Sequence, residues 1–82
     1  MPTPADDICA AMRQAITAAL PDATIQVTPS SPGHFELEVV SAAFAGQPMV
    51  KQQKLVLGAI KDLMSGDGAP VHAIDRLRTR TP

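Results

Sequence analysis

The segment from His34 to Ser41 determines more of the expected fold than any other, because its polar and apolar residues alternate from His34 to Val39. The apolar side chains that fall on one side of an extended chain are Phe35, Leu37 and Val39. This pattern predicts a β-strand with one face in a core and the other in water. A similar alternation over residues 23–28 predicts a second strand. The turn-rich stretch 29–33 between them predicts a loop, so we expect an antiparallel pair.

Helical periodicity lies on both sides of these strands. Residues 4–20 carry apolar side chains three and four positions apart, which predicts a helix with one apolar face. Thr3 can cap this helix, and Pro4 suits its first turn. A second long helix is predicted from Pro48 to the Gly66-Asp67-Gly68 stretch, whose glycines favour a stop.

Two shorter elements complete the chain. Residues 41–46 predict one helical turn, and residues 71–74 predict a short strand. The order is therefore α-β-β-α-β. We expect an α+β fold in which the helices cover one face of a three-stranded sheet, because that arrangement buries all the apolar stripes together. The 82 residues are expected to form a single domain spanning 1–82.

Composition excludes several classes of protein. Phe35 and Phe44 are the only aromatic residues, so base-stacking platforms for single-stranded nucleic acid are not expected. Seven Lys and Arg against eight Asp and Glu give a net charge of −1, which does not favour a nucleic-acid binder. No apolar run reaches the roughly 18 residues of a membrane span. The acidic N-terminus does not resemble a signal peptide, so we expect a cytoplasmic protein.

Motifs of enzymatic chemistry are missing from the sequence, which has no P-loop, CxxC or HExxH. Glu36 and Glu38 share a strand face about 7 Å apart, but a solvated face explains them better than acid–base catalysis. Cys9 cannot form an internal disulfide and fits a reducing compartment. Since it lies in the apolar part of the first helix, we expect a small buried side chain rather than a nucleophile. We therefore predict no catalytic residues.

The two histidines are the candidate metal ligands. His72 opens the last predicted strand, where a neutral imidazole would be accessible to a borderline metal. The simpler alternative is a structural, hydrogen-bonded histidine. One histidine cannot hold a metal alone, so the other ligands would have to come from another molecule. His34 opens the second strand and either approaches the same surface or caps the strand.

Basic residues suggest a second hypothesis, a nucleic-acid-binding regulator of transcription. A helix carrying Lys51-Gln52-Gln53-Lys54 can contact phosphates or bases. The cations that would form a common surface are Lys51, Lys54, Arg76, Arg78 and Arg80. Ordinary solvated faces are the alternative. Neither Ala45-Gly46-Gln47-Pro48 nor Gly66-Asp67-Gly68 supplies the GxxG loop of a KH-type clamp.

Several stretches, in order and spacing, resemble the BolA family. They are His34-Phe35-Glu36-Leu37-Glu38-Val39-Val40-Ser41, Phe44-Ala45-Gly46, Val50-Lys51-Gln52-Gln53-Lys54, Val71-His72-Ala73-Ile74 and Thr79-Arg80-Thr81-Pro82. The resemblance implies an α-β-β-α-β fold with an extra helical turn, related to class II KH domains. Gln52, Gln53 and Lys54 stand where many members have Arg-His-Arg, which resembles the IbaG-type bacterial branch.

The resemblance also implies a function. Family members pair with monothiol glutaredoxins and share a [2Fe-2S] cluster with them and with glutathione. His72 matches the family histidine that supplies an imidazole. Many members have a second His or Cys ligand in the loop between the first two strands. Residues 28–33 contain neither, which leaves His34 as the candidate second ligand.

We therefore expect a non-enzymatic partner of a monothiol glutaredoxin that helps to bind or deliver a [2Fe-2S] cluster, in iron–sulfur trafficking and stress response. Self-association and nucleic-acid binding remain alternatives, and no membrane role is expected. The expected partner contacts lie on the long helix and the last strand, at Lys51, Gln52, Gln53, Lys54, Val71 and Ala73.

Overall fold

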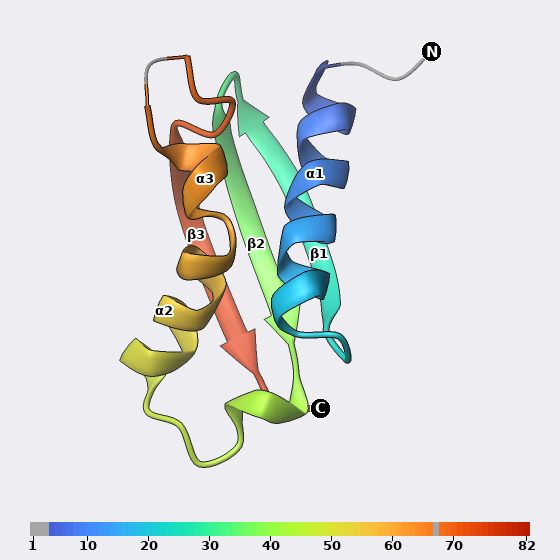
Figure 1. Ribbon diagram of the computed structural model, residues 1–82, viewed down its shortest axis with the longest axis vertical. Helices are drawn as coiled ribbons and strands as arrows, with labels where there is room; N and C mark the ends of the chain where they lie inside the picture. The colour runs from blue at the N-terminus through green and yellow to red at the C-terminus, as the bar shows by residue number, and fades with distance from the viewer. Residues whose placement is uncertain (1–3, 67) are drawn as a thin grey trace.

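A computed structural model describes residues 4–66 and 68–82 (Figure 1). The elements in chain order are α1 (Pro4–Ala19), β1 (Thr24–Ser31), β2 (His34–Val40), the 3-10 turn η1 (Ala42–Phe44), α2 (Met49–Ala59), α3 (Lys61–Met64) and β3 (Ala73–Arg80). The predicted Thr3 cap and the Asp67 part of the predicted helix stop lie outside the described residues. The α+β architecture and the order of its main elements are as the sequence predicted.

The three strands form one sheet in the order β1-β2-β3. β1 runs antiparallel to β2, and β3 runs parallel to β2. A parallel neighbour needs a crossover connection, and η1, α2 and α3 provide it. Figure 1 shows all the helices on one face of the sheet, with α1 over the β1 side and α2 over the β3 side. The predicted one-sided cover of a three-stranded sheet is therefore confirmed.

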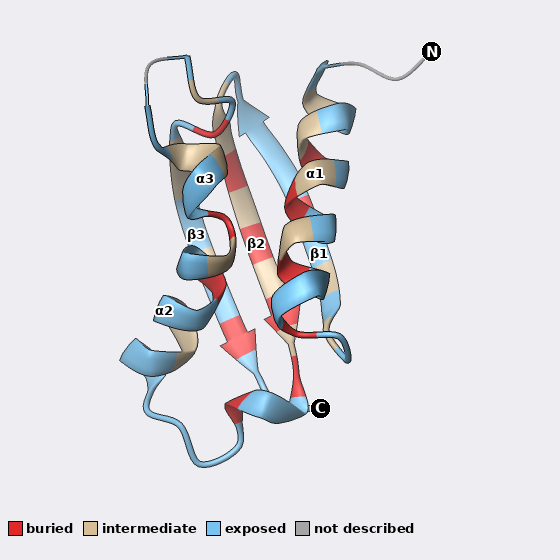
Figure 2. Ribbon diagram, viewed as in Figure 1, coloured by how far each residue is buried: buried red, intermediate tan, exposed pale blue. Residues whose placement is uncertain are grey.

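The core lies between that sheet face and the helices. The alternation predicted for β2 is observed, since its odd-numbered positions from Phe35 to Val39 are buried and its even-numbered positions are half-buried (Figure 2). One hydrophobic cluster joins these strand residues to the buried side of the helices. Its fully or almost fully buried members are Cys9, Met12, Ile16, Leu20, Val27, Phe35, Leu37, Val39, Phe44, Val56, Ile60 and Val71.

β1 is longer than predicted. It continues through Pro29 to Ser31, so the predicted five-residue loop shrinks to a tight turn at Pro32 and Gly33. Pro29 is tolerated because β1 is an edge strand, where a missing N–H costs no ladder hydrogen bond. Gly33 has a φ of 79°, the left-handed region that favours glycine.

β3 is also longer and begins later than the predicted strand at 71–74. Its pairing with β2 jumps between two steps, from Phe35 opposite Ile74 to Glu36 opposite Arg76. Asp75 is therefore an extra residue, a β-bulge. The bulge breaks the two-residue period of β3, because the inward residues Ile74 and Leu77 are three positions apart. Most of this strand therefore could not be recognised from alternating apolar and polar residues.

The second predicted helix is divided. α2 ends at Ala59, Ile60 leaves the helical conformation with a φ of −106°, and α3 adds one further turn. Gly58, two residues before the break, weakens the helix locally because glycine has a low helix propensity. The predicted short turn is present as η1, where the Ser41 hydroxyl accepts a hydrogen bond from the Ala43 N–H.

Candidate functional site at the histidine end of the sheet

The two histidines lie on neighbouring strands at one end of the sheet. His34 is the first residue of β2 and pairs with Ala73, the first residue of β3. His72 directly precedes β3, and its backbone N–H donates to the Gly33 carbonyl at 2.8 Å. The Ala73 N–H donates to the same carbonyl at 3.1 Å. The tertiary fold therefore brings together two residues that are far apart in the chain.

The His72 side chain is exposed to solvent and lies against the backbone of Gly33. A Cβ atom at Gly33 would collide with Nδ1 of His72 and lie 2.6 Å from Cγ and 2.9 Å from Cε1. Across the described chain, no hydrogen bond joins the His72 ring nitrogens to another residue. The ring is thus neither sealed in the core nor committed to a structural hydrogen bond.

The His34 side chain is held by Asp75. Nδ1 of His34 lies 2.9 Å from one carboxylate oxygen of Asp75, and the Ser30 hydroxyl donates to the other at 2.9 Å. These two hydrogen bonds, the His34 bond first, lower the pKa of the Asp75 carboxyl. The pair is partly open to water, with 40% of the His34 side chain and 44% of the Asp75 side chain exposed. The sequence did not identify Asp75 and Ser30, because their contacts join distant segments of the chain and depend on the bulge at Asp75.

The two imidazoles do not form a complete metal site by themselves. Among residues 4–66 and 68–82, no three His, Cys, Asp or Glu side chains converge on a point that could hold a metal ion. An iron–sulfur cluster takes four protein or thiol ligands, and histidine replaces cysteine in some centres. The chemistry of the donors therefore fits such a cluster, and their number fits only a site that a second molecule completes.

Cys9 does not contribute to this site. It is buried in α1, and burial raises the pKa of its thiol, which keeps it protonated and unreactive. This agrees with the predicted role as a small buried side chain.

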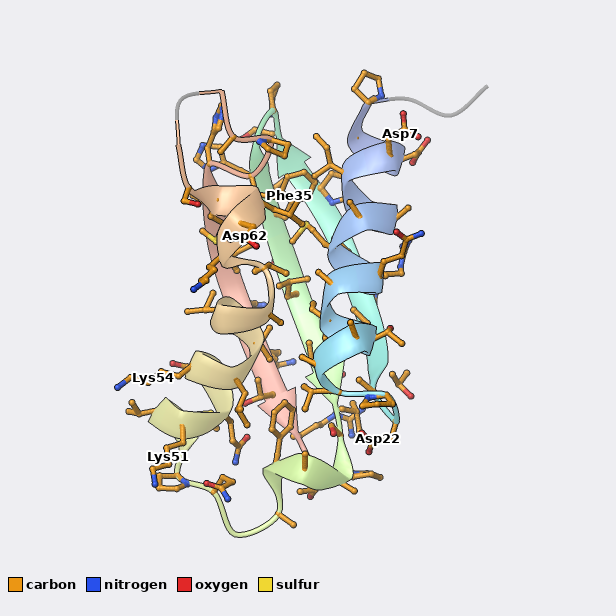
Figure 3. All side chains as sticks on the ribbon, in the orientation of Figure 1. Asp7, Asp22, Phe35, Lys51, Lys54 and Asp62 are labelled. Carbon is orange, nitrogen blue, oxygen red and sulfur yellow. The ribbon has the colours of Figure 1, made fainter. Side chains whose placement is uncertain are left out.

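The predicted partner contacts fall in different environments. Val71 is fully buried, so its side chain supports the site from the core, and the expectation that it contacts a partner at the surface is wrong. Ala73 is half-buried. Lys51 and Lys54 are exposed on α2. Figure 3 shows them toward the end of the molecule that holds Asp22, away from Phe35 at the histidine end.

Gln52 is used inside the fold. Its amide group donates to the backbone carbonyls of Gln47, at 2.8 Å, and Phe44, at 3.4 Å. Its side-chain carbonyl accepts a hydrogen bond from the Thr79 hydroxyl at 2.8 Å. Gln52 therefore joins α2 to η1 and β3, which corrects the expectation that it faces a partner or a nucleic acid. Gln53 is half-buried beside it.

The five cations of the nucleic-acid hypothesis do not form one surface. Lys51 and Lys54 belong to the helix layer, whereas Arg76, Arg78 and Arg80 lie on the opposite, helix-free face of the sheet. Strand alternation explains this, since Thr79 between two of the arginines points to α2. The prediction of a common basic surface is therefore wrong.

The arginines meet acidic residues instead. Arg76 pairs in register with Glu36, and Arg78 with Glu38. A guanidinium nitrogen of Arg80 lies 3.2 Å from a Glu38 carboxylate oxygen. Opposite charges on adjacent strands stabilise such a polar face modestly. The glutamates therefore form the solvated strand face that the sequence favoured.

An apolar groove adjoins the histidine end. It has a volume of about 430 Å³ and lies between the start of α1 and the β1–β2 turn. Its lining includes Pro4, Ile8, Pro29, Pro32 and Gly33. A protein that reached the His72 ring would meet this groove, because Gly33 lines the groove and touches the ring.

No helix within residues 4–66 and 68–82 combines the length and hydropathy needed to cross a bilayer.

Comparison with known proteins identifies the family of the chain. Residues 14–82 match the model of the family described as BolA-like protein. The UV-induced protein uvi31 of Schizosaccharomyces pombe is 39% identical over 49 residues, which cover 60% of this chain and 45% of that protein. The chain thus matches less than half the length of this relative.

Solved structures agree with the sequence match. A BolA protein homologue from Coxiella burnetii has a TM-score of 0.71 at 29% identity, covering 100% of this chain and 94% of that one. The BolA domain of SufE1 from Arabidopsis thaliana has a TM-score of 0.72 at 23% identity, covering 89% of each chain, and shows the shared fold. Since the family model also covers most of the sequence, the chain belongs to the BolA-like protein family.

Proposed function

We propose that this protein is a non-enzymatic partner of a monothiol glutaredoxin and that it helps to hold or deliver a [2Fe-2S] cluster. The observation that carries the proposal is the exposed His72 ring, which makes no hydrogen bond to another described residue and stands where the family has its ligating histidine. Membership of the BolA-like family supports it. His34, held by Asp75 on the neighbouring strand, is the second candidate ligand.

The chemistry of the ligands supports a shared site. Glutaredoxin and glutathione would supply thiolates, and this chain would supply neutral imidazole. Exchanging a thiolate for an imidazole removes negative charge from an iron–sulfur centre and raises its reduction potential. Protons also compete with a metal for the imidazole lone pair at mildly acidic pH, which makes such a ligand releasable and suits a cluster that must be passed on.

The docking surface follows from the position of the histidines. The apolar groove beside Gly33 and the half-buried Ala73 lie at the histidine end. Lys51 and Lys54, in the first half of α2, lie toward the end of the molecule that holds Asp22 (Figure 3). We therefore place the partner on the groove and the starts of β2 and β3, with the two lysines outside the central contact.

The test mixes the protein with a cluster-loaded monothiol glutaredoxin and glutathione, and follows visible absorption and circular dichroism. The wild-type protein is expected to change both spectra, and His72→Ala is expected to abolish the change. Lys54→Ala is the matched surface control and should behave as wild type. Identical spectra for wild type and His72→Ala would contradict the proposal.

A nucleic-acid role receives less support, because the lysines and arginines lie on opposite faces and the arginines neighbour glutamates. If the protein did bind DNA through phosphate contacts, its affinity would fall steeply with salt. We expect no DNA mobility shift at low salt. A salt-sensitive shift that Lys51→Ala and Lys54→Ala weaken would favour this alternative.

A further inference from the structure

We infer that His34 presents Nε2 as its ligating atom with Asp75 as the positioning residue that fixes this tautomer, and that Gly33 is the positioning residue that seats the His72 ring. The inference rests on the proposed function for the identity of the ligand. The proton position of His34 and the seat of the His72 ring in the free protein do not depend on that function.

Asp75 fixes the His34 ring. A carboxylate only accepts hydrogen bonds, so Nδ1 of His34, at 2.9 Å, must carry the proton in the neutral ring. The lone pair then resides on Nε2. The Ser30 hydroxyl holds the other oxygen of the same carboxylate, which restricts rotation of the carboxylate. Histidines that bind metals commonly donate their second ring N–H to a carboxylate in this way, which fixes the tautomer and increases ligand basicity.

The β-bulge explains how Asp75 reaches His34. A regular β3 would alternate from Ile74 directly to the next outward residue, opposite Glu36. The inserted Asp75 has no partner position of its own in the register, and bulges commonly redirect a side chain in this manner. The carboxylate therefore reaches His34 and Ser30, at the end of the sheet where β1 turns into β2.

Gly33 positions the His72 ring by a different means. The atoms nearest to the missing Cβ are Nδ1 and then its two bonded neighbours, Cγ and Cε1. These distances place the missing Cβ nearly above Nδ1, over the face of the ring and not beyond its edge, so the ring stacks on the Gly33 backbone. Any side chain at Gly33 would occupy the place of the ring. The backbone bond from the His72 N–H to the Gly33 carbonyl holds the two residues together.

The two rings are thus fixed by different contacts. Nδ1 of His34 is held by a hydrogen bond, whereas the His72 ring is seated by packing of its face on Gly33. Nε2 of His34 and the exposed His72 ring are left for an acceptor of lone pairs on another molecule. His34 directly follows Gly33 in the chain, and the Gly33 carbonyl accepts hydrogen bonds from the backbone of His72 and Ala73. These backbone hydrogen bonds therefore connect the two positioning contacts.

The first experiment determines the His34 tautomer in the free protein by long-range proton–nitrogen NMR of the imidazoles, at about pH 8 and at higher pH until the spectrum no longer changes. His34 is expected as the Nδ1–H form in the wild type. Asp75→Ala is expected to move it toward the Nε2–H form that free imidazole side chains favour in water. Asp62→Ala on α3 is the control and should leave His34 unchanged. An Nε2–H form in the wild type, or no change in Asp75→Ala, would overturn the inference for His34.

The second experiment uses two glycines with similar backbone angles. Gly33 and Gly46 have φ values of 79° and 72°, but a Cβ at Gly46 meets nothing within 4 Å. Gly33→Ala and Gly46→Ala therefore both place alanine at a positive φ, and only the first displaces a ring. Gly33→Ala is expected to shift the His72 ring resonances and to lose the spectral change with cluster-loaded glutaredoxin. Gly46→Ala should retain both. Equal behaviour of the two variants would overturn the inference for His72.

A measurement on the wild-type protein tests the same contact if Gly33→Ala does not fold. Nuclear Overhauser contacts are expected between the Gly33 α-protons and the Hε1 proton of His72, because Cε1 lies close to the missing Cβ position. Their absence would contradict the proposed seat of the ring.

Loss of the carboxylate is expected to weaken cluster sharing. Removing an outer partner of a ligating histidine typically reduces metal affinity about 10–100-fold, so Asp75→Ala should require correspondingly more protein for the same spectral change. If the His34 tautomer and the His72 contacts are as expected but the cluster spectra are the same for wild type and His72→Ala, the proposed function fails and the positioning inference stands. If the spectra depend on His72 while Asp75→Ala and Gly33→Ala match the wild type, the positioning inference fails and the function stands.

Discussion

Asp22 shows how a single exposed carboxylate can organise a junction in this fold. It follows α1 and accepts hydrogen bonds from the Ser41 hydroxyl at 2.7 Å and the Ala42 N–H at 2.8 Å. Ser41 is fully buried and caps η1. The Ser41 bond first, and the Ala42 bond next, lower the pKa of the Asp22 carboxyl. One side chain therefore ties the α1–β1 connection to the end of β2.

The sign of this pKa shift predicts how acid affects stability. Because the folded-state pKa of Asp22 lies below its unfolded value, the ionised carboxylate stabilises the native state above the unfolded pKa, and that stabilisation is lost as the pH falls through the folded pKa. The stability difference between wild type and Asp22→Asn should therefore shrink toward low pH.

Urea unfolding at several values between about pH 2 and pH 7 measures this difference. Ser41→Ala removes the hydrogen bond that lowers the pKa of Asp22 most, so its stability difference from wild type should also shrink toward low pH. Since the two residues form one contact, the double variant should lose less stability than the sum of the single variants. A difference that stays constant across the pH range would contradict the assignment to Asp22.

At the scale of elements, α2 is fixed to β3 by polar contacts as well as by its apolar side. The Thr79 hydroxyl is almost fully buried and donates to the Gln52 side chain, with the Met49 sulfur 3.3 Å away. Apolar packing holds α2 less extensively, since Val56 is its one fully buried residue among those described. The Thr79–Gln52 bond therefore contributes to holding this helix in place.

We expect Thr79→Val to destabilise the protein by about 1–2 kcal/mol, because it leaves the Gln52 carbonyl without its donor. Thr28→Val, on the exposed edge strand β1, makes the same chemical change without that contact and should alter stability by less than about 0.5 kcal/mol. Chemical unfolding of both variants measures the difference. Equal effects at the two positions would show that the Thr79–Gln52 contact does not stabilise α2.

At the scale of the whole molecule, all the described elements depend on one hydrophobic cluster. A chain of this size buries only about 60–65% of the surface that its unfolded form exposes, so its stability is expected to be small. α2 contributes to that cluster with one side only. Val56 is fully buried, whereas Val50 is 62% exposed.

These two valines allow a matched test of the core. Val56→Ala removes buried methyl groups and leaves a cavity, so we expect a loss of about 2–3 kcal/mol and a fall in Tm of roughly 10–20 °C. Val50→Ala on the same helix should change stability by less than about 0.5 kcal/mol. Thermal unfolding followed by circular dichroism measures both. Similar Tm values would contradict the burial assigned to Val56.

Local periodicity in the sequence was enough to predict the regular elements of this protein. The alternation in β2 and the helical spacing in α1 predicted the buried faces correctly, because a side chain's direction follows from a local period of two or 3.6 residues. The motifs around His34 and His72 identified the family for the same reason, since they are continuous stretches of the chain.

Which side chains those stretches contact depends on how the elements pack and pair, and local patterns do not predict it. The bulge at Asp75, the Asp75–His34 bond and the seat of His72 on Gly33 join residues about 40 positions apart, and no local period records such contacts. The same applies to Gln52, which turns to Thr79, and to the arginines, which face the glutamates across the strand register. Local patterns set which face of an element is buried, whereas the register between strands sets which polar side chains become neighbours.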